Sequence, residues 1–213
     1  MPRNVLALAL AASVSACASA ATPPPSIAPD AQPSIDGLYR VDNSVLQFAE
    51  VKRDLDLTRY DAFMLGPVEV AYQQDPTVRT PGQQDSNFAL TERQMETLKD
   101  TFRDEIQTAL TEDDGYTLVE ASGPNVLRLD AYLIDLVVRF DREATVGRSR
   151  QYTESYGEVT MILELKDSQS GEILARVADR RDPTRTAYGV VEVRSTLVRS
   201  DVTRMFRYWG TTL

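Results

Sequence analysis

The chain has 213 residues, a length that suits one domain with short additional segments. Apolar residues make up 42% and charged residues 26%, as in ordinary soluble globular proteins, and the net charge is −9. This acidic balance argues against nucleic-acid binding and against a polybasic membrane contact, because it repels phosphate backbones and anionic headgroups. The sequence has no histidine and one cysteine. A Ser-His-Asp triad, a Cys-His pair, a His-ligated zinc site and an internal disulfide are therefore excluded.

The first 16 residues have the layout of a secretory signal peptide, with Arg3 before a short apolar run from Val5 to Ala12. Residues 14–17, Val-Ser-Ala-Cys, resemble the lipobox of bacterial lipoproteins, in which the chain is cut before the cysteine and the cysteine is acylated, with palmitate for example. We therefore predict a signal peptide at 1–16 and a lipid anchor on Cys17. Ala18 follows the cysteine, and the sorting rule of such lipoproteins then favours the periplasmic face of the outer membrane.

Two other interpretations of the N-terminus remain open. Residues 18–20, Ala-Ser-Ala, are also an acceptable site for ordinary signal peptidase, which would release a soluble protein without Cys17. An uncleaved anchor is the second alternative, but the apolar run is short for a membrane span, which needs about 20 apolar residues. The lipoprotein is favoured, because the cysteine stands at the one place that the lipobox requires.

Residues 17–37 are predicted to be the lipidated cysteine followed by a disordered tether. Residues 18–36 contain five prolines and no aromatic residue, a composition that favours extended, polyproline-like chain over packing. The globular domain is predicted to span residues 38–213, with its folded part beginning near Leu38.

The first part of this domain predicts a strand, a loop and a helix. Residues 62–65 and 68–71 are apolar and are interrupted by Gly66-Pro67, which indicates a strand with a kink or bulge. The polar stretch 72–90 is long for a loop, and such loops are either functional or disordered. Thr91 to Gln94 fit a helix capping box, and Gly115 is the expected stop. The apolar stripe of this helix consists of Met95, Leu98, Phe102, Ile106, Ala109 and Leu110.

The second part predicts a short strand at 116–120, a long central strand at 126–138 and a second polar loop at 141–156. A hairpin follows, with strands at 158–166 and 172–179 around a turn at 167–171. Residues 190–198 are either strand or irregular, and a helix is expected from Ser200-Asp201, with Phe206 and Trp209 in the core. The fold is thus predicted to be α+β, one domain with a mixed sheet packed against two helices in the order β-α-β-β-β-β-α.

Several of these segments, taken in order, resemble the DUF3313 family of uncharacterised bacterial lipoproteins. The resemblance runs from about Leu38 to the C-terminus and is carried by residues 60–70, 90–110, 126–129, 165–172, 179–181 and 202–209. It implies a lipobox signal and a location in the cell envelope. It implies no known activity and no functional residue other than Cys17.

Three kinds of function are compatible with the sequence. The first is a membrane-tethered binding or scaffolding module with an envelope protein as partner, contacted through the loops 72–90 and 141–156. Both loops are explained equally well as variable surface. Another is a purely structural subunit of an envelope assembly, which an exposed apolar patch or sheet edge would favour.

The remaining kind of function is a hydrolase that uses carboxylates. Such an enzyme is compatible with the absence of histidine, because glycoside cleavage needs only two acids at a set separation. Glu112-Asp113-Asp114 is the densest acidic cluster, but a solvated helix end explains it, and it lacks the alternating spacing of a calcium loop. We therefore predict the tethered binding module, not an enzyme, with no catalytic residue, cofactor or metal.

Overall fold

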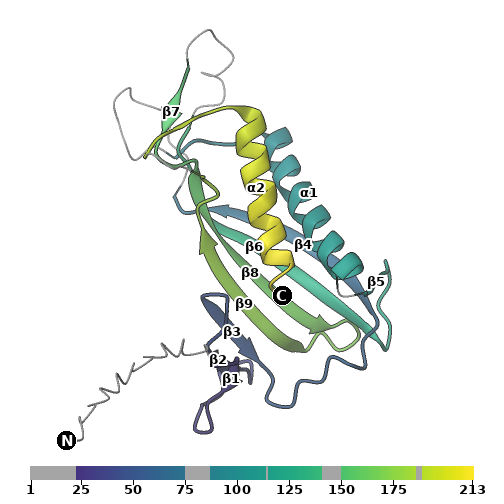
Figure 1. Ribbon diagram of the computed structural model, residues 1–213. Coiled ribbons are helices and arrows are strands. Elements are labelled where there is room, and N and C mark those ends of the chain that lie inside the picture. Colours follow the sequence, from purple (N-terminus) through teal and green to yellow (C-terminus); the bar gives the residue numbers. More distant parts are fainter. Residues whose placement is uncertain (1–22, 75–86, 114, 141–149, 186–188) are drawn as a thin grey trace, which may run out of the picture.

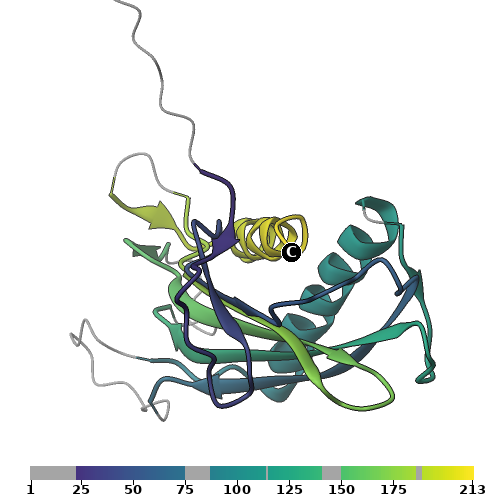
Figure 2. The same ribbon diagram turned by 90° about the horizontal axis from the view of Figure 1, so that it is seen from below.

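A twisted sheet carries both long helices on one of its faces, as Figures 1 and 2 show from two directions. The computed structural model describes residues 23–74, 87–113, 115–140, 150–185 and 189–213. Its eight-stranded sheet has the order β1-β2-β3-β9-β8-β6-β4-β5, and a second sheet pairs β10 with β7. The α+β fold predicted from the sequence, with a mixed sheet against two helices, is confirmed.

The elements of the large sheet and the helices have the following bounds. The strands are β1 (Ser26–Ile27), β2 (Tyr39–Asp42), β3 (Phe48–Val51), β4 (Ala62–Tyr72), β5 (Thr117–Leu118), β6 (Val126–Val138), β8 (Gly157–Asp167) and β9 (Ile173–Arg181). The small sheet consists of β7 (Tyr152–Thr153) and β10 (Val191–Glu192). The helices are α1 (Glu92–Thr108), its π-helical continuation η1 (Ala109–Asp113) and α2 (Ser195–Gly210).

Helix α1 begins at the predicted capping box. The Thr91 N–H donates to the Gln94 side-chain carbonyl over 3.0 Å, and the Gln94 N–H donates to the Thr91 hydroxyl over 3.4 Å. The helix connects β4 to β6, and these two strands pair in parallel, as a helical crossover requires. On its exposed face Lys99 lies 2.9 Å from Glu96 and Arg103 lies 3.6 Å from Asp100, so that both pairs of opposite charge lie three residues apart on the helix.

Bulges interrupt both strands of this parallel pair. In β4 the register shifts between Leu65 and Val68, which confirms the predicted irregularity at Gly66-Pro67. A Cβ atom on Gly66 would lie 1.9 Å from a carboxylate oxygen of Asp130, so glycine allows Asp130 of β6 to approach β4. In β6 the register shifts between Ile134 and Val137 around Asp135, whose φ is 53°. The extra residue resets the alternation, so that Val138 lies on the same face of the sheet as Leu133.

The hairpin β8–β9 has the predicted turn, with Gly171 in the left-handed region at φ 73°. Gly157 at the start of β8 is required for a different reason. Its φ is 128°, and a Cβ atom there would lie 1.8 Å from the carbonyl oxygen of Val137. Glycine therefore allows β8 to begin in close contact with the end of β6.

The N-terminal strands were not predicted. Residues 17–37 were expected to be tether, yet Ser26 and Ile27 pair with Asp42 and Val41 of β2, ahead of the domain boundary expected near Leu38. β2 pairs with β3, and β3 pairs with β9, so this part of the chain extends the large sheet. Strands of two to four residues are too short for an alternating pattern to reveal them. Residues 1–22 lie outside the described part of the chain.

The C-terminal helix begins earlier than expected. It starts at Ser195 instead of Ser200, and Arg194 at its N-cap makes no side-chain capping bond. Residues 191–192 form β10, so the segment 190–198 is part strand and part helix. The predicted start was wrong because Val198 lies on the same helical face as Val202 and Met205, and packing of that face outweighs the weak helix propensity of β-branched residues.

The two helices pack on each other and on the sheet through aromatic side chains. The ring centroids of Phe102 and Phe206 are 5.2 Å apart in an edge-to-face arrangement, and those of Phe206 and Trp209 are 5.7 Å apart. The Trp209 indole N–H donates over 2.8 Å to Asp179, which is 2% exposed. Phe206 and Trp209 are therefore core residues, as the sequence predicted.

Candidate functional site

A pocket lies between the N-terminal halves of the two helices and the adjoining ends of β6 and β8. We call it the helix pocket, and it is lined by Leu98 and Thr101 of α1, Val198 and Val202 of α2, Val138 of β6 and Tyr156, among others. Its cavity volume is about 130 Å³. Its lining is mostly apolar with few polar groups, as in small-molecule sites, but it is smaller than most such sites.

The floor of the pocket is held by hydrogen bonds to the end of β6. The Asn87 amide donates to the Leu136 carbonyl over 3.1 Å and accepts from the Val138 N–H over 2.9 Å. The Phe88 N–H donates to the Val138 carbonyl over 2.9 Å. The C-terminal end of the first long loop therefore fixes the strand end that forms the pocket.

Tyr156 lines the pocket and is held by contacts with its neighbours. Its ring packs edge-to-face on Phe140 at 5.8 Å, its N–H donates to the Thr184 hydroxyl over 2.7 Å, and its carbonyl accepts from the Arg139 N–H over 3.0 Å. Tyr156 is only 3% exposed, yet its hydroxyl has no hydrogen-bond partner among the described residues. An unpaired buried hydroxyl costs about 1–3 kcal/mol, so one that the fold retains calls for an explanation.

The hydroxyl of Tyr156 stays protonated at neutral pH. Burial raises its pKa above the usual value for tyrosine, and the carboxylates of Asp201 and Asp182 raise it further. A neutral phenol can both donate and accept a hydrogen bond. At neutral pH the Tyr156 side chain is therefore not a phenolate, the nucleophilic form of tyrosine.

The side chains of Gln94, Thr97, Thr101 and Glu158, which also line the pocket, already have partners. The hydroxyls of Thr97 and Thr101 donate to helix carbonyls over 2.8 and 2.7 Å, and Gln94 belongs to the capping box. Glu158 is paired with Arg180 at 2.7 Å and with Arg139 at 3.6 Å. The hydrogen bond from Arg180 holds the pKa of Glu158 below its usual range, although burial opposes this effect. Glu158 is therefore a poor proton donor.

Of the two loops predicted to be functional, 72–90 and 141–156, only the C-terminal ends are shown to line this pocket. Leu90, at the end of loop 72–90, and Tyr156, at the end of loop 141–156, both line it. Residues 75–86 and 141–149 of these loops, and the predicted lipidation site Cys17, lie outside the described residues. The sequence did not single out Tyr156, because nothing in its local pattern reveals that its hydroxyl is buried without a partner.

The acidic cluster 112–114 has the position expected of a solvated helix end. Glu112 is exposed in η1, and the side chains of Asp113 and Asp114 lie outside the described part of the structure. Within the described ranges no group of three or more His, Cys, Asp or Glu side chains could hold a metal ion. No helix in those same ranges is both long and apolar enough to cross a membrane.

The model of a family described as "Protein of unknown function (DUF3313)" matches residues 41–213. This chain belongs to the DUF3313 family. No curated protein matches the sequence.

Among solved structures, this DUF3313 protein is similar to the PelC dodecamer from Paraburkholderia phytofirmans, with 11% identity over 72% of this chain and 87% of that chain and a TM-score of 0.37. It is also similar to a DUF330 protein from Xanthomonas campestris, with 12% identity over 71% and 80% and a TM-score of 0.39. A minor lipoprotein from Acinetobacter baumannii shares 10% identity over 71% and 90%, with a TM-score of 0.32.

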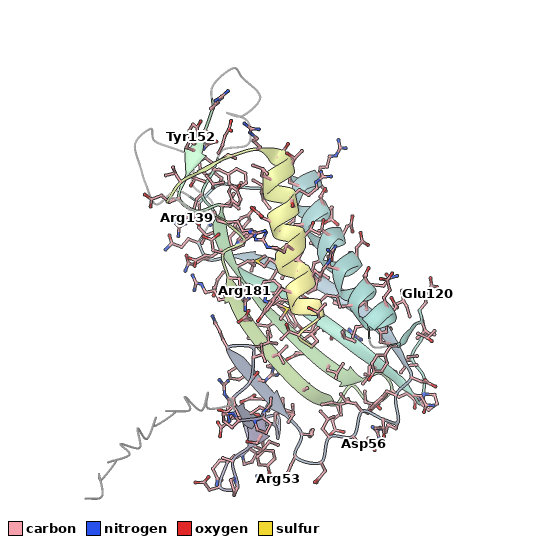
Figure 3. The ribbon with its side chains drawn as sticks, viewed as in Figure 1. Arg53, Asp56, Glu120, Arg139, Tyr152 and Arg181 are labelled. Atoms are coloured by element: carbon pink, nitrogen blue, oxygen red, sulfur yellow. The ribbon has the colours of Figure 1, made fainter. Side chains whose placement is uncertain are left out.

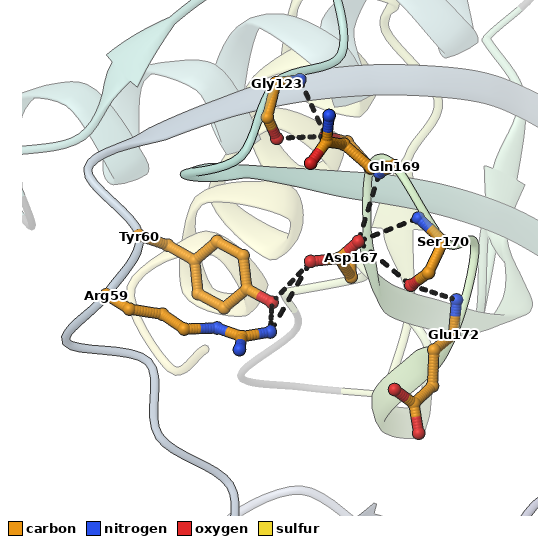
Figure 4. Close-up of polar contacts among 8 residues, drawn as sticks. Arg59, Tyr60, Gly123, Asp167, Gln169, Ser170 and Glu172 are labelled. Atoms are coloured by element: carbon orange, nitrogen blue, oxygen red, sulfur yellow. Dashed lines mark hydrogen bonds and ion pairs between the residues drawn. The ribbon is translucent and has the colours of Figure 1, made fainter.

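Two of the segments that carry the DUF3313 resemblance meet at Asp167, as Figure 4 shows. The Asp167 carboxylate accepts from the Tyr60 hydroxyl over 2.9 Å and from the Ser170 N–H over 2.8 Å, and Arg59 contacts both Tyr60 and Asp167. The Ser170 N–H and the Tyr60 hydroxyl lower the pKa of Asp167 to about 2. These bonds tie the hairpin turn to the segment before β4, so this part of the family pattern has a structural role.

Proposed function

We propose that this DUF3313 protein is a membrane-tethered binding module of the bacterial cell envelope, and that the helix pocket is its binding site. The observation that carries the proposal is the mostly apolar hollow between the two helices and the ends of β6 and β8. A ligand that fills this hollow would bury the apolar surface of its lining. The tether is proposed from the sequence, through acylation of Cys17 on the periplasmic face of the outer membrane.

Binding is favoured over hydrolysis by the state of the carboxyl groups. A general acid needs a raised pKa at neutral pH. Every described carboxyl with a shifted pKa has it lowered, because hydrogen bonds and ion pairs outweigh any effect of burial; these are Asp56, Asp130, Glu158, Glu164 and Asp167. Glu158 is the one among them that lines the helix pocket.

The position of the pocket is compatible with a tether at the N-terminus. The described chain begins beside β1, β2 and β3 at one end of the molecule, whereas the first turns of both helices lie toward the end that carries β7 (Figure 1). An anchor on Cys17 would therefore hold the domain with the pocket directed away from the membrane.

The proposal is tested by native mass spectrometry of the full-length protein extracted from envelope membranes in mild detergent. Val202→Trp fills the pocket from α2, and Val202→Phe fills it less. Ser200→Trp places the same ring on an exposed position of α2 as the matched control. We expect a small molecule to stay bound to the wild type and to Ser200→Trp but to be lost from the filled variants.

A bound mass that persists in both filled, correctly folded variants would contradict the helix pocket as the site. A wild-type protein that carries no ligand, and that no small molecule stabilises against thermal unfolding, would contradict the binding module itself. Ligands that bind the folded state raise its stability by mass action, so the second readout does not depend on retention in the spectrometer.

A structural subunit of an envelope assembly is the second candidate, and one specific feature favours it. Tyr152 of β7 is 56% exposed and the neighbouring Val190 is 55% exposed, and Tyr152 lies at the end of the molecule that carries the small sheet (Figure 3). Sedimentation of the full-length protein and of Tyr152→Ser tests this candidate. It predicts an oligomer that the substitution weakens, and a concentration-independent monomer would contradict it.

A further inference from the structure

A second cavity lies on the face of the sheet that carries the helices, where the sheet continues past the end of α2 toward β1, β2 and β3 (Figure 1). We call it the strand hollow, and it has no described lining residue in common with the helix pocket. Its floor consists of side chains from three neighbouring strands, Leu127, Leu129, Leu163, Leu165, Ala175 and Val177. They share the helix-bearing face, because Val177 alternates along β9 with Asp179, which accepts from Trp209 of α2.

The lining of the strand hollow is mostly aliphatic. None of its described lining residues is charged, although charged residues make up 26% of the chain. The polar side chains among them are Ser44, Tyr116 and Thr212, and the Thr212 hydroxyl already donates to the Tyr208 carbonyl over 2.6 Å. A lining of this kind favours an alkyl group and offers few contacts to a polar one.

The volume of the strand hollow suits a chain better than a single small ring. The cavity volume is about 550 Å³. An apolar cavity of roughly 150 Å³ in another protein takes the six carbon atoms of benzene, so the strand hollow has room for about twenty carbon atoms at the same density. Val45 and Leu213, which also line it, are 68% and 43% exposed. An alkyl chain in the hollow would cover apolar surface that the described structure leaves open to water.

We propose that the strand hollow binds the acyl chain of a membrane lipid and leaves the lipid headgroup outside. This site is separate from the helix pocket, so the inference goes beyond the proposed function. The observation that carries it is the combination of an aliphatic lining without charge and a volume that matches a long alkyl chain.

The position of the strand hollow favours a lipid as the source of this chain. Pro25 lines the hollow and lies eight residues after Cys17, the proposed anchor. Eight residues span at most about 30 Å, so an acylated Cys17 would keep the hollow close to the bilayer. The acyl chains on Cys17 itself are not the proposed occupant, because they anchor the protein only while they stay in the bilayer.

The test places the full-length protein from envelope membranes in phosphatidylcholine vesicles with a trace of phosphatidylcholine that carries a diazirine in one acyl chain. Irradiation attaches the labelled chain to the residues that it contacts, and mass spectrometry of the peptides locates them. Ala175→Trp fills the hollow from β9. Ala178→Trp is the matched control, because Ala178 lies on the same strand and points to the opposite face of the sheet.

A second pair of variants leaves the floor of the hollow intact. Val45→Asp places a charge at the exposed rim, and Val190→Asp makes the same change at an exposed valine that does not line the hollow. Because Val45 is exposed, its substitution should not prevent folding, so this pair decides the matter if Ala175→Trp fails to fold.

We expect labelling of the wild type, Ala178→Trp and Val190→Asp on peptides of β6, β8 and β9 that contain floor residues of the hollow. Ala175→Trp should lose this labelling, because the indole occupies the space of the chain. Val45→Asp should reduce it, because a carboxylate beside an alkyl chain loses hydration.

A wild type without labelled lipid on the floor peptides would overturn the proposal, whether the hollow is empty, holds the protein's own acyl chain or is covered by a second copy. Labelling that persists unchanged in Ala175→Trp and Val45→Asp would also overturn it, because the lipid would then contact another surface. Neither result affects the ligand that Val202→Trp is expected to displace, so this proposal and the proposed function can fail separately.

Discussion

At the scale of single residues, two buried tyrosines differ in whether their hydroxyl has a hydrogen-bond partner among the described residues. Tyr60 is 4% exposed and donates to Asp167 over 2.9 Å, whereas Tyr156 is 3% exposed and its hydroxyl has no partner in the described structure. A buried polar group stabilises the fold only when it is paired. Removal of the two hydroxyls should therefore have opposite effects.

We predict that Tyr156→Phe raises the free energy of unfolding of the ligand-free protein by about 1 kcal/mol, since it removes an unpaired buried group. Tyr60→Phe is the matched control and should lower the free energy of unfolding by about 1–3 kcal/mol, because the Asp167 carboxylate loses a donor. Urea denaturation measures both. A destabilised Tyr156→Phe would show that this hydroxyl is paired in solution.

Asp167 should account for part of the stability that the protein loses at acid pH. Its pKa is lowered from 3.8 to about 2, with the hydrogen bond from the Ser170 N–H as the largest cause and the Tyr60 hydroxyl next. A carboxyl whose pKa is lower in the folded state than in the unfolded state stabilises the fold. This contribution is complete above the pKa of the unfolded state and is lost as the pH falls through the pKa of the folded state. The loss thus lies between about pH 4 and pH 2.

We predict that Asp167→Asn lowers the free energy of unfolding at pH 6 by about 1.5–3 kcal/mol, because a neutral amide replaces the carboxylate that accepts from the Tyr60 hydroxyl and the Ser170 N–H. The variant should also lose less stability than the wild type between pH 4 and pH 2. Denaturation midpoints at a series of pH values provide the measurement. Parallel curves for the two proteins would mean that another carboxyl determines the acid response.

At the scale of elements, the close approach of β8 to β6 depends on Gly157. A side chain there would both strain the backbone at φ 128° and collide with the Val137 carbonyl. We predict that Gly157→Ala costs more than about 3 kcal/mol in the free energy of unfolding. Gly171→Ala is the control, since Gly171 has φ 73° but no atom within 4 Å of the added Cβ. It should cost about 1–2 kcal/mol, the strain alone, and equal losses in thermal unfolding would contradict the steric argument.

The sequence was informative wherever an element is long and periodic. The capping box at Thr91, the bulge at Gly66-Pro67, the long strand at 126–138 and the turn closed by Gly171 were all predictable, because each follows from local chemistry. The N-terminal strands were not, because strands this short exist only through pairing with distant segments. The early start of α2 was missed because tertiary packing of Val198 decided it.

The helix pocket was less predictable than the fold. Its walls are apolar stripe residues, such as Leu98 and Val202, that look like ordinary core in the sequence. Tyr156 becomes unusual only because Phe140, Asp201 and the two helices surround it in three dimensions. The two long loops were identified as candidate recognition segments, and one residue at the end of each, Leu90 and Tyr156, does line the pocket.

At the scale of the whole molecule, an ion-pair network connects the sheet to the N-terminal segment. Lys166 bridges Asp130 and Glu164 at 2.8 Å each, and Arg176 bridges Glu164 and Asp36 at 2.8 and 2.7 Å. Asp36 lies in the segment expected to be tether, so the folded unit includes part of the chain that leads toward the proposed anchor. The ordered domain would then begin close to the membrane.

We predict that Cys17→Ala abolishes stable membrane attachment, because acylation of Cys17 is the proposed anchor. The variant should appear either in the soluble periplasmic fraction or as an uncleaved precursor. Fractionation with and without detergent, together with the mass of the N-terminus, distinguishes these outcomes. Recovery of mature Cys17→Ala protein that still requires detergent would contradict the anchor.

The central claim is that the helix pocket binds small ligands, and NMR of methionine methyl groups in the full-length protein tests it most directly. Met205 lines the pocket, whereas Met64 pairs with Arg128 and alternates with the buried Phe63, which puts it on the opposite face of the sheet. Addition of a small apolar probe such as cyclohexanone should shift the Met205 signal in a saturable way and leave Met64 unchanged, and Val202→Trp should abolish the shift. An unmoved Met205 signal, or equal shifts of both methionines, would contradict a binding site between the helices and the sheet.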